Sequence, residues 1–156
     1  MLHSAKSLDA EVKEELAKQL NQVVAEVAVT TMLAQNFHWN VKGMAFGPLH
    51  ELFQEIYEDH FEAQDEVAER LKAIGGHAEG RLAEMVKRSK VPEQDGRQDA
   101  QEMIRLMSAA QKTISDTIAG VASYADGKGD VATHDLLIGR QITHEKFAWI
   151  LDAHLA

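Results

Sequence analysis

Residues 47–76 read GPLHELFQEIYEDHFEAQDEVAERLKAIGG, and the spacing of their apolar residues decides the fold class. Apolar residues recur at helical spacing through the whole stretch, which predicts one long helix. Gly47-Pro48 is a start signal, with proline expected at the first helical position, and Gly75-Gly76 is a stop signal. One face of this helix is apolar and is expected to lie in a bundle core: Leu49, Leu52, Phe53, Ile56, Val67, Leu71 and Ile74.

Three further segments show the same helical periodicity. The first is predicted to begin near Ser7, as its N-cap, and to end near Asn40. A long crossover follows the second helix, and a later helix over 103–121 closes at the glycines of 126–129. The last runs from about Asp130 to Leu155. Four long helices in 156 residues predict an all-α, four-helix bundle that forms a single domain over residues 1–156.

Composition limits the chemistry that this chain can perform. Cys is absent, so any metal must be bound by His, Asp or Glu. No secretory signal and no long uninterrupted apolar run are present, which predicts a cytoplasmic protein without a membrane partner. Acidic residues outnumber basic ones by 25 to 16, for a formal net charge of −9. Such a surface favours cations as partners over nucleic acid.

The polar residues of the second helix divide into two faces. Five acidic residues form one stripe, which is either a plain solvated face or the lining of a cavity that gathers cations: Glu51, Glu55, Asp59, Glu62 and Glu66. A second strip holds His50, Gln54, Asp65 and Glu69. His50 and Asp65 are 15 positions apart, which is about 22 Å along a helix and too far for one shared metal ion. Two copies packed antiparallel about a two-fold axis would bring His50 of one subunit to Asp65 and Glu69 of the other.

Residues 36–76 also resemble a known family. The His-Trp pair at 38–39, the Leu-His pair at 49–50 and the run DEVAER before Gly75-Gly76 closely resemble the Dps (DNA-protection-during-starvation) family of ferritin-like proteins. The resemblance implies a hollow homododecamer that oxidises iron(II), preferentially with hydrogen peroxide, and stores the ferric iron. It also implies metal ligands that are shared between subunits: His38, His50, Asp65 and Glu69.

The chain departs from the family pattern at one ligand position, where Gln54 replaces an aspartate. A neutral amide binds iron more weakly than a carboxylate does. Trp39 matches a family aromatic thought to intercept radicals, and an interface aromatic is the alternative. Asp130 and Asp135 are spaced like the acidic residues of the family's iron-entry pores, although Asp130 is alternatively the N-cap of the last helix.

Other interpretations of these residues remain open. Singly, Asp65 and Glu69 are ordinary surface carboxylates, and His60 falls on the core face as a hydrogen-bonded buried imidazole. No Glu lies three residues before any His, which excludes the intrasubunit site of ordinary ferritins. The alternative function is a DNA-compacting protein with weak or lost oxidase activity. The tail MLHSAKSLD carries only Lys6 as a permanent cation, so we expect weak or absent DNA binding.

Overall fold

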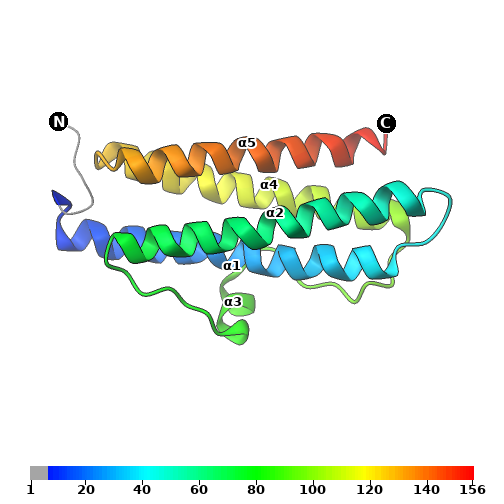
Figure 1. The fold of residues 1–156 in the computed structure, drawn as a ribbon, viewed down its shortest axis with the longest axis horizontal. Coiled ribbons are helices and arrows are strands. Elements are labelled where there is room, and N and C mark those ends of the chain that lie inside the picture. The colour runs from blue at the N-terminus through cyan, green and yellow to red at the C-terminus, as the bar shows by residue number, and fades with distance from the viewer. Residues whose placement is uncertain (1–6) are drawn as a thin grey trace.

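The computed structural model describes residues 7–156, which form five α-helices and no strand (Figure 1). The helices are α1 (Ala10–Asn40), α2 (Phe46–Ala73), α3 (Leu82–Arg88), α4 (Ala100–Gly127) and α5 (Val131–Ala153). The four long helices form the bundle, and the short α3 lies outside it (Figure 1). The all-α prediction is confirmed. Tail residues His3 and Lys6 lie outside the described residues.

Helix α1 packs against α2, and α4 packs against α5. The crossover between α2 and α4 returns along the bundle, so these two helices run in the same direction (Figure 1). All predicted core residues of α2 are buried, together with the apolar faces of α1 and α4. None of the helices in residues 7–156 combines the length and the apolar character that a membrane crossing requires.

Polar side chains of α1 hold the crossover in place. Near the beginning of the crossover, the Asn21 side chain donates to a backbone carbonyl oxygen at 2.9 Å. In its middle, the Glu26 carboxylate accepts from a backbone N–H at 3.1 Å, and near its end the Asn36 side chain donates to a backbone carbonyl oxygen at 3.0 Å. Gly96 comes so close to the Asn36 side chain that a Cβ atom at residue 96 would lie 2.0 Å from Asn36 Oδ1. With a φ of +79°, Gly96 also has a backbone conformation that other residues rarely adopt. The crossover therefore has a fixed course across α1, although its sequence shows little periodicity.

Two predicted helix starts were wrong by a few residues. The N-cap of α1 is Asp9 and not Ser7. Helix α2 begins at Phe46, so Pro48 is its third residue and not its first. The predicted first position and the observed third position of Pro48 both lie in the first turn of α2. Backbone N–H groups there have no partner within the helix, so proline costs no hydrogen bond at either position.

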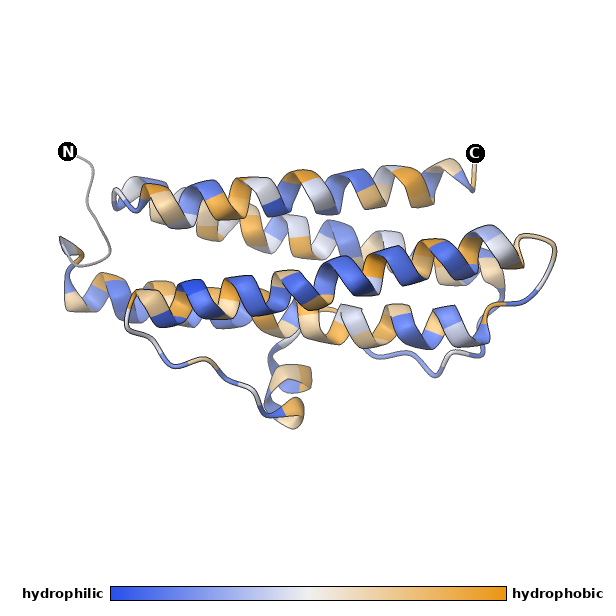
Figure 2. Ribbon diagram, viewed as in Figure 1, coloured by the Kyte–Doolittle hydropathy of each residue, from blue (hydrophilic) through white to orange (hydrophobic). Residues whose placement is uncertain are grey.

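The acidic stripe of α2 is interrupted in the structure. Hydrophilic residues dominate the middle of this helix (Figure 2), and Glu51, Glu55, Glu62 and Glu66 are exposed. Asp59 is only 28% exposed, because its carboxylate is paired with a cation from α5. The prediction of one continuous carboxylate stripe is therefore wrong at Asp59.

Candidate metal centre

The structure brings His38 and His50 together at one end of the bundle. His38 lies in the last turn of α1, and His50 lies in the first turns of α2. Their rings stack with centroids 3.7 Å apart and an interplanar angle of 13°. The short connection between the two helices places the rings side by side, although the residues are 12 positions apart.

The two histidines bind each other's backbone. The Nδ1 atom of His38 lies 2.6 Å from the carbonyl oxygen of His50, and Nδ1 of His50 lies 2.7 Å from the carbonyl oxygen of His38. A carbonyl oxygen only accepts hydrogen bonds, so each Nδ1 must carry the proton. In a neutral imidazole the other nitrogen then has a free lone pair. Both Nε2 atoms are thus prepared to bind a metal ion, by the backbone contacts that ligating histidines commonly use.

Two aromatic rings flank the histidine pair. Phe46 stacks on His50 with centroids 4.9 Å apart, and the Tyr57 ring meets His38 edge to face at 5.3 Å. These contacts restrict rotation of both imidazoles. Trp39, next to His38 in sequence, is 62% exposed.

The predicted carboxylate ligands lie farther along α2. Asp65 and Glu69 are one helical turn apart and exposed, and neither makes a hydrogen bond or ion pair within residues 7–156. In that range, no three His, Asp or Glu side chains of one subunit are arranged to hold a metal ion. One chain therefore brings together the histidine half of the predicted ligand set and leaves the carboxylate half apart.

A groove of about 510 Å³ opens beside Asp65, between α2, α1 and the segment that leads into α3. Phe61 lines it and is 68% exposed, and Leu82 on α3 is 79% exposed. An exposed aromatic ring beside a groove is a feature that surfaces contacting another chain often have.

Gln54 lies one turn after His50, as predicted. Its side-chain nitrogen donates to Glu58 Oε1 at 2.8 Å. The amide orientation follows from this contact, because a carboxylate oxygen accepts and only the NH₂ group of the amide donates. The side-chain oxygen makes no hydrogen bond within the described part of the chain, so it is the atom that a metal ion would meet.

Asp130 is the N-cap of α5, as the alternative interpretation proposed. Its side chain accepts from the backbone N–H of Thr133, and it forms a 3.0 Å ion pair with Arg70 from the end of α2. The Asp130 side chain is almost completely buried, whereas Asp135 is exposed.

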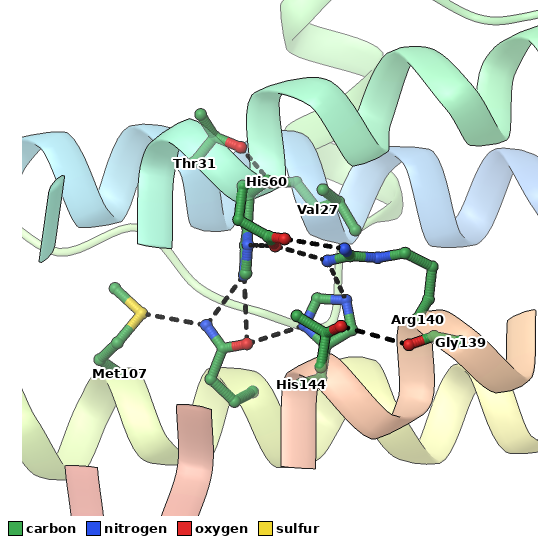
Figure 3. A network of polar contacts seen from close by, with 10 residues as sticks. Val27, Thr31, His60, Met107, Gly139, Arg140 and His144 are labelled. Atoms are coloured by element: carbon green, nitrogen blue, oxygen red, sulfur yellow. Dashed lines mark hydrogen bonds and ion pairs between the residues drawn. The ribbon is translucent and has the colours of Figure 1, made fainter. Parts of the chain in front are cut away.

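Sequence reasoning missed a buried polar ring in the middle of the bundle (Figure 3). Its members come from three helices: Asp59, His60, Gln111, Arg140 and His144. Arg140 donates to both oxygens of Asp59 at 3.1 and 2.8 Å, and to Nε2 of His144 at 3.0 Å. His144 Nδ1 lies 2.8 Å from Gln111 Oε1. The Gln111 amide nitrogen lies 2.9 Å from His60 Nε2, and His60 Nδ1 lies 2.9 Å from Asp59.

The donors and acceptors of this ring fit one arrangement of protons in which both imidazoles are neutral. Gln111 Oε1 also lies 3.1 Å from His60 Nε2, but a proton there would make His60 a charged imidazolium, which its burial disfavours. Because Arg140 can only donate, His144 Nε2 accepts and its Nδ1–H donates to Gln111. The Gln111 NH₂ group then donates to His60 Nε2, and His60 Nδ1–H donates to Asp59. Both imidazoles are neutral in this arrangement. His60 was correctly predicted to be a hydrogen-bonded core residue, but the spacing of His144 in the sequence gives no signal of its partners.

Burial and charge maintain these protonation states. Burial lowers the pKa of His60, and burial together with the neighbouring Arg140 charge lowers the pKa of His144 to about 2. Burial alone would raise the pKa of the Asp59 carboxyl, but hydrogen bonds from His60 and Arg140 outweigh it and hold that pKa well below its usual range. At neutral pH the ring therefore contains one carboxylate, one guanidinium and two neutral imidazoles.

Comparisons with known proteins agree with this architecture. The family described as a ferritin-like domain matches residues 17–156. The DNA protection during starvation protein 2 of Bacillus anthracis is 33% identical over 92% of this chain and 99% of its own length. This chain belongs to the Dps family of ferritin-like proteins.

Solved Dps structures have the same fold. The Dps protein from Bacillus brevis superposes with a TM-score of 0.91 at 32% identity, covering 96% of this chain and all of that one. The Dps protein from Vibrio cholerae O1, described as a member of a superfamily of ferritin-like diiron-carboxylate proteins, gives a TM-score of 0.93 at 26% identity. That match covers 100% of this chain and 98% of the other. The Dps resemblance found in residues 36–76 is thus confirmed over nearly the whole chain.

Proposed function

We propose that this Dps-family chain oxidises iron(II), preferentially with hydrogen peroxide, and stores the ferric iron inside a hollow homododecamer in the cytoplasm. The observation that carries the proposal is the pair of free Nε2 atoms fixed by the reciprocal backbone contacts of His38 and His50. Imidazole together with carboxylate suits iron(II), and a site with open positions supports peroxide chemistry.

In this proposal a second copy of the chain supplies the missing carboxylates. Asp65 and Glu69 of that copy meet His38 and His50 across a two-fold axis, which generates two equivalent sites. The unpaired state of both carboxylates and the exposed apolar side chains beside Asp65 support this assignment. Hydrogen peroxide accepts one electron from each of two iron(II) ions and, with two protons, leaves as two water molecules. Trp39, exposed beside His38, is placed to intercept radicals that escape this reaction.

The remaining residues of the proposal concern iron entry. We assign Asp130 and Asp135 to pores through which cations enter the shell. Exposed Asp135 would attract the cation directly. Asp130 would mainly fix the wall of the pore, because its carboxylate is held by Arg70 and by the backbone of α5.

DNA protection, which the names of several relatives mention, is the second candidate function. The net charge of −9 argues against direct binding of duplex DNA at physiological salt. In our proposal the chain would protect DNA mainly by consuming peroxide and iron(II) together, which needs no contact with the duplex.

Anaerobic titration of the iron-free oligomer with iron(II), followed by peroxide, tests the proposed function. We expect saturable binding and then oxidation of about two iron(II) ions per peroxide, because peroxide accepts two electrons. Intact oligomers that show no saturable binding would exclude an oxidation site of this kind.

Gln54→Asp is expected to tighten iron(II) binding by about tenfold and to accelerate the peroxide step, because it restores a charged oxygen ligand. Gln54→Asn is the matched control, since it shortens the side chain equally without adding charge. Affinity is measured by anaerobic titration, and rate by stopped-flow absorbance. Equal behaviour of the Asp and Asn variants would show that residue 54 does not contact the iron.

A further inference from the structure

The guanidinium of Arg140 occupies a position where metal-ligand atoms converge. One of its nitrogens, Nη2, lies 2.8 Å from a carboxylate oxygen of Asp59 and 3.0 Å from Nε2 of His144 (Figure 3). Its other terminal nitrogen lies 3.1 Å from the second oxygen of Asp59. A carboxylate and an imidazole nitrogen are the ligand types that bind divalent transition metals in a protein without cysteine.

The rest of the ring keeps these atoms ready to bind a cation. His144 donates Nδ1–H to Gln111, so its Nε2 lone pair faces Arg140. His60 donates to Asp59 and orients the carboxylate. A second group that orients each ligand is the arrangement found around protein metal sites. Here the same arrangement surrounds a guanidinium.

The ring also lies between facing helices, where many helical bundles place their metal sites. Asp59 lies on α2, whereas Arg140 and His144 lie on α5, with Gln111 on α4. Side chains that project inward from facing helices build the metal sites of many helical bundles. Asp59 retains 28% exposure, so a cation from solvent can reach the carboxylate. Arg140 Nε is buried without a hydrogen-bond partner, so only the two terminal nitrogens of the guanidinium hold it in the ring.

We propose that Asp59 and His144 form a latent divalent-metal site in the bundle, and that the Arg140 guanidinium takes the place of the metal ion. Its positive charge neutralises the Asp59 carboxylate, and its N–H group donates a hydrogen bond to the Nε2 lone pair of His144. Iron(II) that reaches the acidic surface of α2 is thereby kept out of the bundle. Removing the guanidinium would leave a partly buried carboxylate without a counter-charge, which favours binding of another cation.

Cobalt(II) titration of a His50→Ala background tests this proposal, because that change removes the proposed intersubunit site. Adding Arg140→Ala, or Arg140→Gln to preserve more volume, should create saturable binding of about one cobalt(II) per subunit, with visible absorption bands of nitrogen and oxygen ligation. Arg140→Lys is the matched control, since it keeps a cation in the ring and should bind no additional cobalt(II). Adding His144→Ala to the Arg140→Ala protein should abolish the new binding.

Folded Arg140→Ala and Arg140→Gln oligomers that bind no more cobalt(II) than the His50→Ala parent would overturn the proposal. Should neither variant fold without metal, refolding in the presence of zinc(II) is expected to recover the helical oligomer, and failure of zinc(II) to do so would also count against the latent site. The outcome is independent of iron oxidation, because the background lacks His50.

Discussion

Oligomers co-assembled from equal amounts of His50→Ala and Asp65→Ala subunits are expected to recover about one quarter of the wild-type iron(II) sites. Each variant alone should have almost none. In a mixed pair, the Asp65→Ala subunit supplies the intact histidines and the His50→Ala subunit supplies the intact carboxylates. One of the two sites in such a pair is therefore complete, and the other lacks ligands from both sides.

Anaerobic iron(II) titration after refolding the mixed subunits measures this recovery. The matched control mixes His50→Ala with His38→Ala, which damages the same half of the site in every subunit and should restore nothing. Equal recovery in both mixtures would contradict a site that is divided between subunits. So would an Asp65→Ala protein that binds iron(II) as tightly as the wild type, because the proposal requires the carboxylate to come from the second copy.

Acidification is expected to destabilise this protein strongly, because the buried ring requires neutral histidines. His144 has a pKa of about 2 in the folded chain and 6.5 as the ordinary value. Between these values the unfolded chain binds the additional proton, so the free energy of unfolding falls as the pH falls below about 6.5. Each pH unit removes about 1.4 kcal/mol for such a group. The lowered pKa of His60 acts in the same direction, and that of Asp59 adds a further loss below about 3.8.

Urea unfolding between pH 7 and pH 4.5, at one protein concentration, measures this dependence. His144→Gln keeps polar atoms in the ring but removes a titrating group. This variant should be less stable than the wild type at pH 7. Its stability should also fall less steeply with acidification, by about 1.4 kcal/mol per pH unit. Parallel slopes for the two proteins would mean that His144 is not held neutral by the fold.

The sequence by itself determined the helical bundle and most of its core. Helical periodicity is a local property, so the apolar faces of α1, α2 and α4 could be read directly and are buried as predicted. The separation of His50 and Asp65 also follows from the helix rise alone, and it required a second chain for any shared site. The family motif added the residues that we propose as metal ligands. The seven residues of α3 show too little periodicity to be recognised.

Only the tertiary structure decided which distant side chains meet. The stacking of His38 on His50 depends on how the connection between α1 and α2 turns, and their tautomers depend on carbonyl groups that the stacking brings within reach. The pairing of Arg140 with Asp59 spans 81 positions of the chain. No local pattern encodes it, because burial of the whole bundle is what removes water from these groups and forces them to bind one another.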